Sequence, residues 1–258
     1  VGLNVVDTAE CYLDSEELIG RAVSPRRREF YLFTKCGHAS SSGLAHPDWS
    51  PRLLSESIDR SLARLRTDYL DLLQLHSCSA EVLQRGEVIE VLQRAREQGK
   101  TRFIGYSGDG TDALYAVECG AFDTLQTSVN VADQQALELT LPPARERGMG
   151  VIAKRPLANA VWKHRDRPAD PYVQPYWERL RQLDYGFLRG DVGEAVGKAL
   201  RFTLSVPGVH TAIVGTARPG RWRENAELLG AGPLSTEEFG SIRERWGQAA
   251  EADWFGEV

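Results

Sequence analysis

The sequence lacks the long apolar runs that a membrane-spanning helix needs. Within its 258 residues, apolar stretches such as Val5–Val6 and Ala212–Val214 fall far short of the roughly 20 residues required. It also lacks a basic excess, because 31 Lys and Arg face 36 Asp and Glu, giving a net charge of −5. Nucleic-acid binding usually relies on a basic face, so that class of partner is disfavoured. The remaining composition, 42% hydrophobic and 26% charged, is that of a globular protein and fits one domain of 258 residues.

Cysteine is scarce and scattered. Cys11, Cys36, Cys78 and Cys119 lie 25 or more residues apart, with no CxxC pair. No histidine stands at metal-ligand spacing from them, so neither a zinc site nor a disulfide scaffold is indicated. Reduced thiols are typical of the cytoplasm, where we expect the protein to reside. The chain starts without Met in an apolar segment, VGLNVVDTAE, and we expect residues to be missing before it.

Short β-rich runs alternate with amphipathic helical segments along the whole chain. The runs that predict strands are Leu3–Thr8, Phe30–Lys35, Tyr69–His76, Arg102–Ser107, Thr124–Asn130, Gly150–Lys154 and Thr211–Gly215. Most are apolar on both faces, as parallel strands buried on both sides should be. Helical periodicity follows in SEELIGRAV, with Ser15 expected as N-cap, and in SPRLLSESIDRSLARLRT, with Pro51 at its first helical position.

Polar residues stand where these strands end. The first four strands end at or next to Asp7, Lys35, His76 and Ser107. In a (β/α)8 TIM barrel such ends converge on one face, where the site is built. An open doubly wound sheet is the alternative, but no GxGxxG dinucleotide motif follows any strand. We therefore predict an α/β barrel as a single domain over residues 1–258. Because seven strands are visible and eight are usual, we expect this sequence to lack the first βα unit.

Motifs at these strand ends resemble the aldo-keto reductase family. NVVDTAECYLDSEELIG is similar to the family's Asp-Thr-Ala-x-x-Tyr-x-x-Ser-Glu signature. FTK, DLLQLH, GYS, LQTSVN and IVGTARPGRWREN follow in the family's order. The resemblance covers nearly the whole chain and implies a TIM barrel that binds a nicotinamide cofactor.

The residue types suit carbonyl reduction independently of the family name. Hydride transfer to a carbonyl builds negative charge on oxygen, which requires a proton donor there. Tyr12 is the natural acid, and a nearby Lys35 ammonium would lower the pKa of its phenol from about 10. Asp7 would pair with Lys35 and keep it charged. His76 would donate a hydrogen bond that orients the carbonyl oxygen.

The resemblance also implies the cofactor residues. Ser107 and Gln126 would hold the carboxamide of the nicotinamide, although Gly108 stands where the family usually has Asn. Lys154 stands where an aromatic residue usually stacks on the nicotinamide ring, and Trp162 is an alternative for that contact. Gly215 and Thr216, with Arg218, Arg221 and Asn225, would grip the adenosine 2′-phosphate and the adenine. A guanidinium at a helix N-terminus suits phosphate, which favours NADP(H) while leaving NAD(H) possible.

Three functions remain open. The leading one is an NADP(H)-dependent oxidoreductase acting on a small aldehyde or ketone, in either direction. A cofactor-binding regulatory subunit on the same fold is the second, and a lyase or aldolase using Lys35 or Lys154 as a Schiff base is the third. The loops Gly37–Trp49 and Asn159–Pro175, expected to border the substrate, carry no readable specificity code, and the sequence leaves the oligomeric state open.

Overall fold

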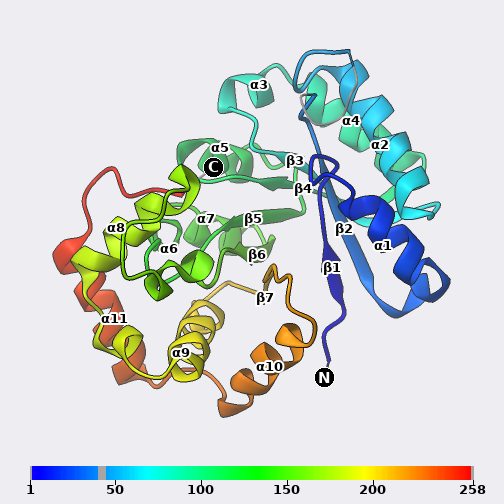
Figure 1. Ribbon diagram of the computed structural model, residues 1–258. Helices are drawn as coiled ribbons and strands as arrows, with labels where there is room; N and C mark the ends of the chain where they lie inside the picture. Colours follow the sequence, from blue (N-terminus) through cyan, green and yellow to red (C-terminus); the bar gives the residue numbers. More distant parts are fainter. Residues whose placement is uncertain (1, 40–44, 257–258) are drawn as a thin grey trace. The chain divides into compact units, whose positions relative to one another are not determined.

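A computed structural model describes residues 2–39 and 45–256 of the chain. It comprises two compact units, the first ending at Leu125 and the second beginning at Gln126. Strands and helices alternate in both (Figure 1). The described residues contain seven strands: β1 Val5–Asp7, β2 Tyr31–Cys36, β3 Leu70–His76, β4 Thr101–Ser107, β5 Thr124–Ser128, β6 Gly150–Lys154 and β7 Thr211–Ala212. Each overlaps one of the seven strands that the sequence predicts.

The first unit is built around four parallel strands in chain order. β1 pairs with β2, β2 with β3, and β3 with β4. The register sets Asp7 beside Phe33, and His76 beside Ser107. Parallel pairing in chain order brings the carboxyl ends of all four strands to the same edge of the sheet, where the predicted polar residues lie.

In the described residues of this unit, five α-helices follow the strands. They are α1 Ser15–Val23, α2 Pro51–Leu65, α3 Ala80–Gln84, α4 Glu87–Glu97 and α5 Gly110–Glu118. In Figure 1, α1, α2 and α4 lie in succession along one side of the unit, and α1 contacts α2 as α2 contacts α4. The Ser50 side chain caps α2 by accepting from the Leu53 N–H, and Pro51 opens the helix as predicted. The Ser15 prediction was wrong: Asp14 is the N-cap of α1, and the Ser15 hydroxyl accepts from Thr8 Oγ1 instead.

The core of this unit centres on β3. Its leucines Leu70, Leu72, Leu73 and Leu75 are each at most 2% exposed, so both faces of the strand are covered. Burying one leucine side chain contributes about 1.5–3 kcal/mol to folding. A strand of this kind reads as a nearly continuous apolar run, which is why the sequence predicts it correctly.

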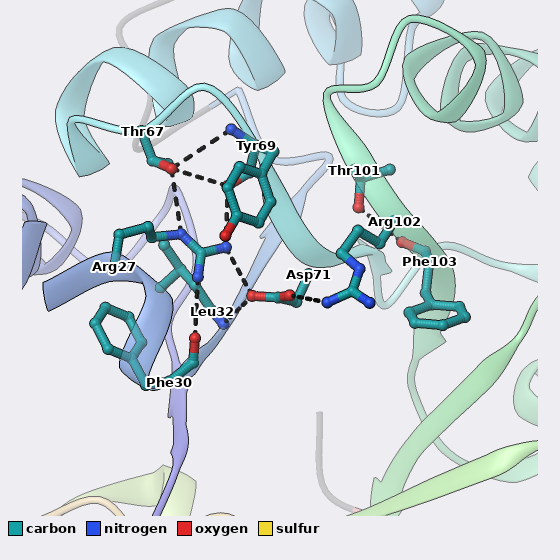
Figure 2. Close-up of polar contacts among 9 residues, drawn as sticks. All are labelled: Arg27, Phe30, Leu32, Thr67, Tyr69, Asp71, Thr101, Arg102 and Phe103. Carbon is teal, nitrogen blue, oxygen red and sulfur yellow. Dashed lines mark hydrogen bonds and ion pairs between the residues drawn. The ribbon is translucent and has the colours of Figure 1, made fainter.

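An ion network ties the amino ends of β2, β3 and β4 together (Figure 2). Asp71 is buried near the start of β3 and accepts from Arg27 Nη2 at 2.6 Å and from Arg102 Nη1 at 3.0 Å. It also accepts from the Leu32 backbone N–H at 2.9 Å. The Arg27 guanidinium lies 4.1 Å above the Tyr69 ring. This buried carboxylate is therefore both paired and hydrogen-bonded, as burial of a charge requires.

The second unit holds the remaining strands. β6 pairs with β7 in parallel, with Ile152 beside Thr211. β7 ends at Ala212, earlier than the predicted Gly215. The α-helices described in this unit are α6 Ala136–Leu139, α7 Leu141–Glu146, α8 Gln174–Leu183, α9 Val192–Ser205, α10 Arg221–Leu228 and α11 Thr236–Ala249. None of the helices in the described residues is long and apolar enough to cross a membrane.

Candidate active site

A buried ion pair joins the ends of β1 and β2. Lys35 Nζ lies 2.6 Å from Asp7 Oδ2, and these side chains are 1% and 7% exposed. The same ammonium donates to the Thr8 carbonyl oxygen at 2.9 Å. Asp7 is the last residue of β1 and Lys35 the penultimate residue of β2, so the parallel register carries both to the same edge. Because both side chains are almost fully buried from water, the attraction between their opposite charges is strong.

Tyr12 lies beside this pair on the turn between β1 and α1. The turn is held by hydrogen bonds from the Tyr12 N–H to the Ala9 oxygen and from the Ser15 N–H to the Tyr12 oxygen. Lys35 Nζ lies 5.4 Å from the centre of the Tyr12 ring, and the tyrosine is 47% exposed. His76, the last residue of β3, packs edge-on at 5.8 Å between ring centres. The structure thus brings together all four residues that the sequence selected as catalytic.

Cys11 contacts the same histidine. Its Sγ lies 3.4 Å from His76 Nδ1, a contact that the sequence did not suggest. Burial raises the pKa of the Cys11 thiol to about 11, with the Glu10 carboxylate contributing, so the sulfur stays protonated at neutral pH. Burial likewise raises the pKa of Cys78 to about 12. All four cysteines are free thiols, and the two with these values are not poised as nucleophiles.

A second imidazole extends the cluster of rings. His38 lies edge-on to His76 at 4.9 Å and edge-on to Trp49 at 5.2 Å between ring centres. Trp49 Nε1 donates to the His76 carbonyl oxygen at 3.1 Å. Sequence reasoning missed His38, because it stands in a loop without periodicity. The one available signal was its place three residues after Lys35.

Ser107 ends β4 next to His76 in register, and its carbonyl oxygen accepts from the Ser77 N–H at 2.7 Å. The structure explains why Gly108 follows it. A Cβ at position 108 would lie 2.6 Å from the Tyr106 ring, which is buried and donates to the Cys78 carbonyl oxygen at 2.6 Å. An asparagine there would therefore displace a fixed ring.

The arginines predicted to bind phosphate gather in the second unit. α10 begins at Arg221, preceded by Gly220 in a left-handed conformation. Glu224 pairs with Arg221, Nη1 to Oε2 at 3.3 Å, and also with Arg218. Thr216 Oγ1 accepts from the Arg218 N–H. Two guanidiniums thus converge on one carboxylate at a helix N-terminus, an arrangement that also suits a phosphate.

Asn225 on α10 carries a second sign of a ligand. Its side chain is buried, yet among the described residues neither its amide oxygen nor its amide nitrogen has a hydrogen-bond partner. Leaving such groups buried and unpaired is costly, so a planar polar group such as adenine, with donors and acceptors on one edge, fits here. The residues present therefore fit the adenosine end of a dinucleotide.

The other predicted cofactor residues are placed without such clear geometry. Gln126 is buried on β5, Lys154 ends β6 half-buried, and Gly215 is exposed beyond β7. Trp162 lines a cavity of about 490 Å³ together with His164, Trp177, Leu180, Arg181, Asp184, Tyr185, Leu188 and Arg189. Within the described ranges, no group of three or more acidic, histidine or cysteine side chains is arranged to hold a metal ion.

Comparison with known proteins places this geometry in a family. The Aldo/keto reductase family model matches residues 1–246. A 6-dehydroglucose reductase from Novosphingobium aromaticivorans is 35% identical, covering 88% of this chain and 76% of its own. An aldo-keto reductase from Bacillus halodurans in its holo form superposes with a TM-score of 0.79 at 25% identity, over 98% of this chain and 85% of that one.

A further solved structure was determined with cofactor bound. It is an aldo-keto reductase from Klebsiella pneumoniae in complex with NADPH, with a TM-score of 0.70 at 25% identity, over 100% of this chain and 84% of that one. These likenesses confirm the predicted α/β barrel fold class, with seven strands in the described residues. The chain belongs to the aldo/keto reductase family of NAD(P)H-dependent oxidoreductases.

Proposed function

We propose that this protein reduces a small aldehyde or ketone with NADP(H), and that Tyr12 supplies the proton. The observation that carries the proposal is the buried Lys35–Asp7 pair beside the exposed Tyr12 and the half-buried His76. A bound nicotinamide cofactor would supply the hydride that reaches the carbonyl carbon. Family membership over residues 1–246 supports treating the whole chain as one functional domain.

Each residue then has a separate task. The Lys35 ammonium, 5.4 Å from the ring centre, stabilises the phenolate that Tyr12 becomes after giving up its proton. Asp7 holds that ammonium in place and balances its charge. His76 donates to the substrate oxygen and positions it for the Tyr12 proton. The product alcohol leaves, and Tyr12 regains a proton from solvent through its exposed side.

The preference for NADP(H) rests on the second unit. Arg218 and Arg221 would hold the 2′-phosphate at the start of α10, and the buried Asn225 amide, which has no hydrogen-bond partner among the described residues, would bind adenine. Ser107, Gln126, Lys154, Gly215 and Thr216 would complete the contacts, as the family resemblance implies.

The alternatives fit the geometry less well. A Schiff-base lysine must present a neutral amine, whereas Lys35 is fixed in an ion pair 2.6 Å from Asp7. A purely regulatory subunit has no need of an acid, a cation and a hydrogen-bond donor around one point.

The test is the loss of NADPH absorbance with a panel of aldehydes, comparing Tyr12→Phe with Tyr31→Phe. Tyr31 is a matched control because it is 48% exposed, close to the 47% of Tyr12, and lies at the start of β2. Removing the acid should slow the reaction by about 10²–10⁴-fold, while the control keeps wild-type rates. Near-normal turnover of Tyr12→Phe would exclude it as the acid, and trapping by borohydride with a carbonyl substrate would favour the lyase.

A further inference from the structure

We infer that His38 is a substrate-binding residue that recognises a hydroxyl group next to the reacting carbonyl. The inference rests on the proposed function and narrows it: the preferred substrates are α-hydroxy carbonyl compounds, the chemistry of sugars and their open-chain fragments. Its basis is the second imidazole 4.9 Å from His76.

The backbone of His38 is held in place by Glu10. Its backbone N–H donates to Glu10 Oε1 at 3.2 Å, and the neighbouring Gly37 N–H donates to the same oxygen at 2.8 Å. Glu10 itself is buried, and Arg60 lies 3.5 Å from its other oxygen. The buried Glu10 carboxylate therefore fixes the backbone of this turn by accepting hydrogen bonds from both Gly37 and His38.

Trp49, against which the His38 ring packs, is also held in place. Its backbone N–H donates to the Gly37 carbonyl oxygen at 2.9 Å. A Cβ on Gly37 would lie 2.7 Å from the Trp49 indole, and Gly37 has a φ of +139°, so only glycine suits this position. The indole therefore packs directly on this turn, and the His38 ring packs edge-on against it.

Of the two ring nitrogens of His38, Nδ1 faces Asp48 and Nε2 is available to a ligand. Nδ1 lies 3.6 Å from Asp48 Oδ2, and Asp48 Oδ1 accepts from the Ala39 N–H at 2.7 Å. In the part of the chain that the structure describes, His38 Nε2 makes no hydrogen bond or ion pair. The carboxylate favours the proton on Nδ1, which leaves Nε2 to accept from a ligand, and a protonated ring would donate. A hydroxyl group can satisfy either state because it both donates and accepts.

The distance between the two imidazoles determines where that hydroxyl group must lie on the substrate. His76 would hold the carbonyl oxygen, and the His38 ring is 25% exposed and stands beside it. Ordinary bond lengths place the two oxygens of an α-hydroxy carbonyl about 2.7–3.6 Å apart. That separation lets one oxygen meet each imidazole, whereas a simple aldehyde leaves His38 without a partner. The related 6-dehydroglucose reductase is named for a sugar substrate, which agrees with this class.

The experiment compares glycolaldehyde with acetaldehyde, which differ only in the α-hydroxyl group. We expect wild-type kcat/KM to favour glycolaldehyde. His38→Phe keeps a ring against Trp49 and His76 but removes the hydrogen bond, so the glycolaldehyde preference should fall about three- to tenfold. The loss should appear mainly in KM, because this contact exists before and during the reaction. His38→Gln, which can still hydrogen-bond, should recover part of the preference.

His46→Phe is the matched control. His46 stands in the same stretch of chain and pairs with Glu56, Nε2 to Oε2 at 3.3 Å, so its replacement should leave the glycolaldehyde preference unchanged. An unchanged preference in His38→Phe, or equal losses for both aldehydes, would overturn the inference while leaving the reductase function intact. Failure of the wild-type protein to reduce either aldehyde would instead count against the proposed function.

Discussion

The Asp7–Lys35 pair should behave as one unit in folding, and a double-mutant cycle can measure this. At 2.6 Å and an effective dielectric constant of about 20, the attraction between the two charges is about 6 kcal/mol. Removing both charges from water costs several kcal/mol per ion, so the pair adds little net stability. Removing one partner is different, because it leaves the other charge buried and unpaired.

We therefore expect Asp7→Asn and Lys35→Met each to lower the free energy of unfolding by about 3–5 kcal/mol. Asp7→Asn should lie at the lower end, since the Thr8 oxygen still accepts from the ammonium at 2.9 Å. The double variant should lose at least about 2 kcal/mol less than the sum of the single losses. Urea unfolding followed by circular dichroism and tryptophan fluorescence gives these values, and coincident transitions justify a single free energy.

The chain supplies its own control for distance. Arg26 Nη2 and Glu29 Oε2 are also 2.6 Å apart, but their side chains are 69% and 57% exposed. The same cycle there should give little or no coupling, because water screens the charges. Additive losses at Asp7 and Lys35, or coupling no larger than in the exposed pair, would refute the view that burial governs this site.

Three further predictions concern other charged groups. Arg221→Ala should weaken NADPH binding by about tenfold or more but NADH binding by less than about twofold. Glu224→Gln removes the carboxylate that pairs with Arg218 and Arg221, so it should strengthen NADPH binding. Fluorescence titration measures both affinities. Burial raises the pKa of Glu10 above its ordinary 4.5, so the folded protein retains a proton that the unfolded chain has released. Stability should therefore fall as the pH rises above about 4.5, and thermal melts of Glu10→Gln should lack that decline. Arg27→Met should destabilise the protein by about 3–5 kcal/mol in urea, but Arg102→Met by less than about 1 kcal/mol, because their exposed fractions are 11% and 57%.

The sequence predicts well what local periodicity and strand ends encode. The apolar repeats predict β3 and α1 to within a residue. Asp7, Lys35 and His76 can be selected because each stands at a strand end, whereas Tyr12 is selected through the family signature that follows Asp7. The contacts that His38 and Cys11 make with His76 could not be predicted, because each joins residues that lie far apart in the chain. No short-range pattern carries such information.

Gly108 shows the same limit from the other side. The sequence marks it only as the loss of a usual asparagine, without a reason. The structure relates the loss to Tyr106, whose ring occupies the space that a side chain at 108 needs. The close approach depends on how the backbone continues after β4, because Gly108 follows Ser107, the last residue of that strand.

In the first unit, the amino ends of the strands carry a paired buried charge, whereas the carboxyl ends carry residues with left-handed backbone. At the amino ends, Asp71 is paired twice, which suits stability alone (Figure 2). The non-glycine residues with left-handed backbone near the carboxyl ends are Leu13, Trp49 and Ser77, at φ of 48°, 54° and 58°. Such conformations cost about 1–3 kcal/mol each and persist where surrounding contacts hold them. Leu13 follows Tyr12 directly and is 87% exposed, so its burial contributes little to folding and does not account for its strained backbone. The strained backbone of Leu13 instead lies in the turn that presents Tyr12 beside Lys35. Hydrogen bonds from the Tyr12 N–H to the Ala9 oxygen and from the Ser15 N–H to the Tyr12 oxygen offset this cost, so the turn keeps Tyr12 exposed and next to a buried charge.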